Sequence, residues 1–251
     1  MNDTTGAVAA PPENRILRGL PAEERDQLAG LFHHVSLPAK TVLFEPGQVI
    51  RAVHFPLDGV ISLVTPLGEG AIVEVATIGN EGIVGVPLVA GGSLAVRAIA
   101  QVGGHALRMD ADAFMAELDR LPGFRRLVRR YIQALFGQIS QAAACNRLHS
   151  NEERLSRWLL MSQDRVRTDE FAITHEYLAH MLGSRRATVS RSAGILQAAG
   201  LIKYHRGRVT IVDRAALEAT ACECYGTIER AMDGVVQRAF RRSSSGAVPT
   251  T

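Results

Sequence analysis

The segment from Tyr177 to Val212 contains six Lys or Arg residues and two His residues but no Asp or Glu. The whole chain is nearly balanced, with 28 Lys plus Arg against 25 Asp plus Glu. The segment has the pattern of two short helices, a tight turn and a strand hairpin. Charge of one sign on so small a module suits a polyanion, because each neutralised phosphate releases condensed counterions. The alternative is a solvated basic surface on an ordinary small domain.

Two helices that meet at a glycine are expected at the start of this segment. Thr174 is placed to cap the first helix, and Gly183 can adopt the left-handed conformation that turns the chain. Ser184 can cap the second helix. Ala179, Gly183 and Val189 have the spacing of a helix-turn-helix, in which a small residue, a corner and an inward apolar residue are required.

The second helix, residues 185–196, is expected to enter a DNA major groove with its N-terminal half. Arginine in that position donates two hydrogen bonds to guanine O6 and N7. The candidates for base readout are Arg185, Arg186, Ser190 and Arg191. The stretch 200–212 is typical of a hairpin wing, and phosphate contacts are expected from Thr174, Thr188, Lys203, Arg206 and Arg208.

Two further regions of the chain have different sequence patterns. Between Val42 and Met109, short β-branched runs alternate with glycine-bearing breaks, which is typical of an antiparallel roll. Beyond it lies a long helical stretch with apolar residues at alternating three- and four-residue steps. These residues predict a dimer seam, as in a coiled coil, formed by Phe124, Val128, Tyr131, Leu135 and Ala142.

A second apolar stripe on the same helix lies largely off that seam and contains Leu127, Ile132, Phe136 and Ile139. Two apolar faces require two covers, which would be the roll and the same helix of a second subunit. A helix buried within a single domain is the alternative.

We therefore expect an α+β protein with an N-terminal antiparallel, jelly-roll-like β-roll, a long dimerisation helix and a C-terminal winged helix-turn-helix domain. The predicted boundaries are a disordered tail at 1–14, the roll at 15–118, the dimerisation helix at 119–149, the winged domain at 150–213, a C-terminal helix at 214–240 and a disordered tail at 241–251.

This combination resembles the Crp/Fnr superfamily of bacterial transcription regulators. The most specific part of the resemblance runs from Ile173-Thr174 through Gly183-Ser184-Arg185-Arg186-Ala-Thr-Val-Ser-Arg191 to Gly200-Leu-Ile202. It implies a homodimer that reads a roughly palindromic operator, with half-sites about one helical turn apart. Family members commonly have Arg-Glu where this chain has Arg186-Ala187, so the operator should differ. Ser192 replaces a commonly apolar packing residue.

The resemblance also places a ligand pocket in the roll. The two stretches that match the cyclic AMP site contain Gly85, Val86, Arg97 and Ala98. Glu81, between two glycines, either belongs to a simple turn or faces the same pocket. Arg97 matches the phosphate-binding arginine or pairs with a carboxylate such as Glu74 or Glu81. Val86 replaces the glutamate that holds the ribose hydroxyl, and valine accepts no hydrogen bond. Cyclic AMP is therefore disfavoured, while another nucleotide or constitutive action stays open.

The cysteines argue against a cofactor. No cysteine precedes Cys145, so the N-terminal iron–sulfur site of the oxygen-sensing branch is absent. Cys222 and Cys224 alone do not fill a tetrahedral metal site, and His205 is only a speculative partner. We expect Cys145 to be an apolar filler on the seam and assign no metal ligands.

The expected function is that of a cytoplasmic, DNA-binding transcription regulator whose partners are double-stranded DNA, a second copy of itself and RNA polymerase. The alternative is a cyclic-nucleotide or metabolite-binding module that acts through protein partners. No membrane span is expected, because the chain has no run of 18 uncharged apolar residues. No catalytic set stands out, so an enzyme is not expected.

Overall fold

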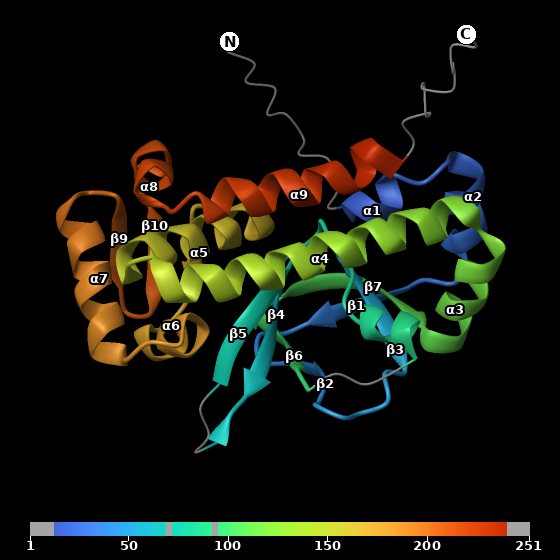
Figure 1. Ribbon diagram of the computed structural model, residues 1–251, viewed down its shortest axis with the longest axis horizontal. Coiled ribbons are helices and arrows are strands. Elements are labelled where there is room, and N and C mark those ends of the chain that lie inside the picture. The colour runs from blue at the N-terminus through green and yellow to red at the C-terminus, as the bar shows by residue number, and fades with distance from the viewer. Residues whose placement is uncertain (1–12, 69–71, 92–94, 240–251) are drawn as a thin grey trace, which may run out of the picture.

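Two antiparallel sheets form the N-terminal roll of the protein, whose structure is a computed structural model describing residues 13–68, 72–91 and 95–239 (Figure 1). The strand orders are β1-β7-β3 and β2-β6-β4-β5. The strands are β1 (His33–Leu37), β2 (Val42–Phe44), β3 (Ala52–Pro56), β4 (Val60–Pro66), β5 (Ile72–Ile78), β6 (Arg97–Val102) and β7 (Gly104–Asp110). This arrangement confirms the predicted antiparallel roll.

Two short helices precede the roll, α1 (Arg15–Arg18) and α2 (Ala22–Ala29), and a 3-10 helix, η2 (Val86–Ala90), follows β5. Asn14, which was expected in the N-terminal tail, is buried and accepts hydrogen bonds from the first backbone N–H groups of α1. The rest of that tail and the predicted C-terminal tail lie outside the described residues, Glu13 excepted.

Helix α3 (Ala111–Arg120) leads into the long helix α4 (Pro122–Leu148), which begins with proline at its first turn, where the missing N–H has no intrahelical partner. Phe124 of α4 packs edge-to-face on Phe114 of α3 and lies 6.3 Å, centroid to centroid, from Phe55 in the roll. These aromatic contacts join the roll to the start of α4.

The predicted dimer seam is wrong, because its residues are used inside the chain. Figure 1 shows α4 lying on the roll with α9 alongside it. All five expected seam residues are buried in the single chain, and all but Ala142 belong to a core shared with the roll and with Ile228, Met232 and Val235 of α9. The second stripe instead supplies an exposed apolar side chain, since Phe136 is 71% exposed.

The helix-turn-helix domain follows α4 directly. It contains α5 (Asn151–Val166), β8 (Glu170–Ala172), α6 (His175–Leu182), α7 (Arg186–Ala198), β9 (Ile202–His205) and β10 (Arg208–Ile211). Helix α5 starts in a capping box, in which Ser150 and Glu153 satisfy each other's backbone N–H groups. The strand order is β8-β10-β9, so the expected wing hairpin gains a third strand that the sequence did not indicate.

Two helices replace the single helix expected at the C-terminus, α8 (Arg214–Thr220) and α9 (Cys224–Ala239). Helix α9 returns along α4 towards α1, where Arg15 pairs with Asp233 (Figure 1). Among the described residues, no helix is long and apolar enough to cross a bilayer.

Candidate DNA interface and ligand cavity

The corner between α6 and α7 has the geometry that the sequence predicted. Thr174 accepts a hydrogen bond from the Tyr177 backbone N–H at 3.2 Å and caps α6. Gly183 ends the helix at φ +57°, and the Ser184 N–H donates to the Ala179 carbonyl at 2.9 Å. Val189 is fully buried. The two helices are therefore held at the fixed angle of a helix-turn-helix.

Ser184 does not cap the second helix as expected. Its hydroxyl donates to Oδ1 of Asn151 at 2.6 Å, and Arg185 occupies the cap position. Ser192 is buried, where its hydroxyl donates to Glu152 at 2.7 Å. Both serines therefore fasten α7 and the turn before it to the first turn of α5.

The candidate base-reading residues lie on one exposed end of α7, at the end of the molecule far from α2 and α3 (Figure 1). Arg185, Arg186 and Arg191 are exposed, and none of them has a carboxylate partner within ion-pair distance in the described part of the chain. Ser190 is half-buried and bonds through its hydroxyl to Nδ1 of His175 at 2.9 Å. Three arginines thus face solvent without an internal counter-charge.

The wing adds further cations. Arg206 and Gly207 connect β9 to β10 with φ values of +47° and +75°, the conformation of a two-residue hairpin turn that matches the strand twist. Lys203 and Arg206 are exposed, whereas Arg208 pairs with Glu170 of β8. Thr188 is half-buried in the first turn of α7. A phosphate would compete with Glu170 for Arg208.

An apolar cavity of about 470 Å³ lies between the roll, η2 and α4. All the described residues that line it are apolar: Phe44, Leu63, Ile78, Ile83, Gly85, Val86, Pro87, Val89, Ala90, Ile132, Leu135, Phe136 and Ile139. Of the five residues expected at a ligand pocket, Gly85 and Val86 therefore line this cavity.

The other three expected pocket residues are engaged elsewhere. Glu81 is buried and binds Arg165 of α5 at 2.7 Å. Arg97 donates to Glu45 at 2.8 Å, a partner that lies in the loop after β2 and that the sequence did not indicate. Ala98 is buried in the roll core. No charged group of the described chain lines the cavity to meet a phosphate.

The three cysteines, expected to be idle, lie together. Cys145, in the last turn of α4, meets Cys222, just before α9, and Cys224, the first residue of α9. His149 completes the group. His205 is on the wing and does not take part. The spacing of Cys145 and His149, one helical turn apart, was the signal in the sequence that could have suggested this group.

Two family models match the chain. A cyclic nucleotide-binding domain matches residues 34–120, and a Crp-like helix-turn-helix domain matches residues 153–220. The chain is thus a two-domain protein with a cyclic nucleotide-binding fold followed by a Crp-like helix-turn-helix. It belongs to the Crp/Fnr family of transcription regulators.

Solved structures share this fold along most of their length. FixK2 from Bradyrhizobium japonicum is 15% identical with a TM-score of 0.65, and the match covers 76% of this chain and 98% of FixK2. A CRP-family transcriptional regulator from Thermus thermophilus is 22% identical with a TM-score of 0.62, covering 74% and 96%. The c-di-GMP responsive regulator CLP from Xanthomonas campestris is 14% identical with a TM-score of 0.59, covering 76% and 99%. No curated protein sequence matches the chain significantly.

Proposed function

We propose that the protein is a homodimeric transcription regulator that binds a roughly palindromic DNA operator through α7. The exposed arginines of α7, which have no internal counter-charge, carry this proposal. A module that acted only through protein partners would not need an uncompensated basic surface on a helix-turn-helix. RNA polymerase is the expected partner of the DNA-bound dimer.

The roles of individual residues follow from their places. Arg186 and Arg191, on the exposed face of α7, are proposed to bind guanine edges, each contact contributing about 1–3 kcal/mol of discrimination. Lys203, on the wing, is proposed to bind a phosphate, which adds affinity without sequence choice. Ala187 provides no carboxylate for cytosine, so the operator should lack the cytosine contact that a glutamate would make.

Selection of genomic DNA fragments at rising salt tests this function. Bound fragments should narrow to a shared motif as salt rises, because phosphate contacts weaken first. Arg186→Ala and Arg191→Ala should lose the motif, while Lys203→Ala should weaken all sequences alike and lower the salt slope by about 1. Arg18→Ala, an exposed arginine on α1, is the control. If Arg186→Ala, Arg191→Ala and Lys203→Ala all weakened binding equally on every DNA sequence, the assignment of α7 as the base-reading helix would be wrong.

The lining of the cavity in the roll indicates which class of effector molecule the protein could bind. A cyclic phosphodiester needs a cation for its phosphate, and the described lining offers none. A small apolar molecule fits the cavity better than cyclic AMP. Thermal-shift measurements with cyclic AMP, cyclic di-GMP and a panel of apolar metabolites test this, since only a bound ligand raises the midpoint of unfolding. Stabilisation by cyclic AMP would contradict it.

A further inference from the structure

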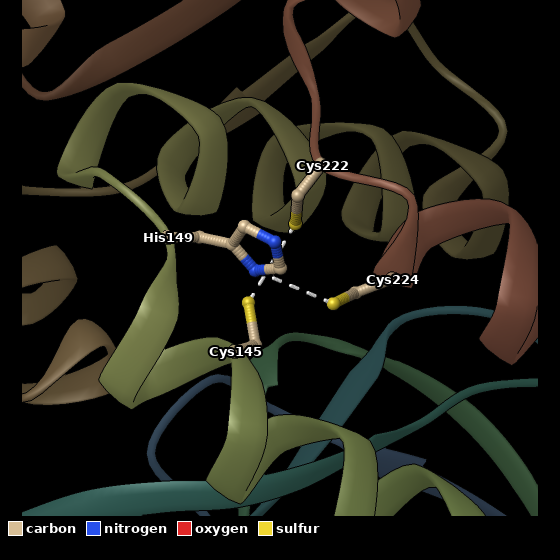
Figure 2. Close-up of side chains that lie close together, drawn as sticks. All are labelled: Cys145, His149, Cys222 and Cys224. Carbon is tan, nitrogen blue, oxygen red and sulfur yellow. Dashed lines mark hydrogen bonds between the residues drawn. The ribbon is translucent and has the colours of Figure 1, made fainter.

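Four potential metal-binding side chains converge where α4 meets α9 (Figure 2). Cys145 is in the last turn of α4, and His149 follows that helix directly. Cys222 precedes α9, and Cys224 is its first residue. Their potential ligand atoms all lie within 4.8 Å of one another. The cluster shares no residue with the lining of the roll cavity and uses none of the residues proposed to bind DNA.

Two of the ligand–ligand separations match those around a single tetrahedral ion, and all of them are below 4.8 Å. Bond lengths of about 2.3 Å to sulfur and about 2.0 Å to nitrogen place two sulfurs about 3.8 Å apart and a sulfur and a nitrogen about 3.5 Å apart. The Sγ atoms of Cys145 and Cys222 are 3.6 Å apart, and Sγ of Cys224 lies 3.5 Å from Nδ1 of His149. An iron–sulfur cluster would hold its ligands further apart, because several irons and sulfides lie between them.

The surroundings also suit a metal site. Nε2 of His149 lies 3.2 Å from a carboxylate oxygen of Glu223, so the ring is oriented with Nδ1 towards the sulfurs. The side-chain amide of Gln141 donates to Sγ of Cys224 at 3.0 Å, a bond that favours the thiolate. All three sulfurs belong to buried residues, which limits access of water and oxidants.

Two buried arginines supply the charge that such a site requires. Three thiolates and a neutral imidazole around a divalent ion carry one net negative charge. Arg157 interacts electrostatically with Cys145, and Arg154 with Cys145 and Cys222. Neither arginine has a carboxylate ion pair among the described residues, and the Nε atom of each lacks a hydrogen-bond partner. Arg157 also interacts electrostatically with the Glu74 carboxylate, although the two form no ion pair. Buried cations that have no ion-paired carboxylate fit an anionic metal centre.

We propose that Cys145, His149, Cys222 and Cys224 bind one divalent transition-metal ion, with Zn²⁺ as the best fit to an S₃N tetrahedron. Each cysteine binds the ion as a thiolate, so its thiol proton is released to solvent. The ion holds the start of α9 against the end of α4, and so ties the C-terminal helix to the short segment that connects α4 to α5.

Metal analysis of the full-length protein, purified under reducing conditions from zinc-supplied cells, is the first test. We expect one zinc per chain. After removal of the zinc by a chelator, Co²⁺ should give the visible bands of tetrahedral cobalt together with thiolate-to-cobalt charge transfer. Zn²⁺ should then abolish that spectrum. Absence of any transition metal, together with no cobalt spectrum from folded protein, would overturn the proposal.

Variants assign the ligands. Cys145→Ser and Cys222→Ser should lose the charge-transfer band, while Glu223→Gln should weaken zinc binding by about 10- to 100-fold by removing the orienting carboxylate. The ligand variant His149→Gln is compared with a control variant, His205→Gln on the wing, which should bind zinc normally. Unchanged zinc binding by Cys222→Ser would contradict the ligand set.

A measurement on the unaltered protein covers the case in which these variants do not fold. With zinc bound, the three cysteines should resist alkylation, and they should react after chelation, as followed by mass spectrometry. A native mass two hydrogens lower and without zinc, from a Cys145–Cys222 disulfide, would instead overturn the proposal.

Discussion

Single residues fasten the helix-turn-helix domain to the roll. Glu81, before η2, and Arg165, on α5, form an ion pair in which both side chains are almost completely buried, at 7% and 2% exposure. Arg165 also donates to the Met161 carbonyl at 2.6 Å. A buried pair of this kind contributes little net stability when intact, but either partner alone is costly.

Glu81→Gln should therefore destabilise the fold by about 3–5 kcal/mol, because Arg165 would remain charged and buried. The double variant with Arg165→Met should recover much of that loss. Urea unfolding, followed by the fluorescence of the single tryptophan, Trp158, measures both. Arg208→Met breaks the exposed pair with Glu170 and should cost at most about 1 kcal/mol. An equal loss in Glu81→Gln and Arg208→Met would show that the buried pair has no special cost.

Glu74 makes the docking of α5 depend on pH. Its carboxylate accepts hydrogen bonds from Ser62 and from the Trp158 indole at 3.0 Å. Burial raises the pKa of Glu74 from 4.5 to about 7. Between pH 4.5 and about pH 7, the Glu74 carboxyl is therefore protonated in the folded state but ionised in the unfolded state. Stability should fall as pH rises through this window and stay lower above it.

Glu74→Gln should remove this pH dependence, since the amide has no proton to lose. The free energy of unfolding of Glu74→Gln, relative to that of the parent protein, should rise by about 1–3 kcal/mol from pH 5 to pH 8, because each pKa unit corresponds to about 1.4 kcal/mol. Urea unfolding at a series of pH values measures it. Parallel stability profiles for the two proteins would mean that Glu74 titrates normally in the folded state.

At the scale of elements, the α6–α7 corner depends on one glycine. Gly183 has φ +57°, and a Cβ there would lie 3.5 Å from the Val73 side chain, an ordinary contact. The cost of Gly183→Ala is thus one of backbone strain, about 1 kcal/mol. Gly194→Ala, inside α7 with open space around it, should instead stabilise by about 0.5–1 kcal/mol. Thermal unfolding of the two variants should shift in opposite directions, and equal shifts would exclude the backbone explanation.

The sequence predicted this corner well because its signals are local. The cap at Thr174, the left-handed Gly183 and the inward Val189 each depend on neighbours within a turn or two, and the structure has all three as expected. The antiparallel roll was equally accessible, since glycine breaks and β-branched runs recur at strand spacing.

The assignment of the faces of α4 failed for a reason that local pattern cannot overcome. Periodicity identifies apolar stripes but not what covers them. The stripe of Phe124 and Leu135 is covered by the roll and by α9, a helix almost a hundred residues later. The cysteine cluster was missed likewise, because Cys145 meets Cys222 only when α9 folds back along α4.

For the whole molecule, we propose that the twofold dimer forms through the exposed side of α4. Phe136 is 71% exposed, and the half-buried Ile132 and Ile139 lie one turn away on either side. When one face of a helix packs against the same face of a second copy, every residue of that face occurs twice in the interface. Burial of two Phe136 side chains would add about 3–6 kcal/mol to association, which is two to four powers of ten in Kd.

Phe136→Glu should therefore convert the proposed dimer into a folded monomer, because the exposed side chain contributes little to the fold of one chain and the two charges would repel across the twofold axis. Sedimentation equilibrium at micromolar concentration measures the change, and binding to a palindromic operator should weaken with it, since each monomer reaches only one half-site. Val49→Glu puts the same charge at another exposed apolar position, in the roll, and should stay dimeric. If the unaltered protein were monomeric, or if Phe136→Glu dimerised as tightly, pairing through this face of α4 would be excluded and the two α7 helices would need another surface to bring them together.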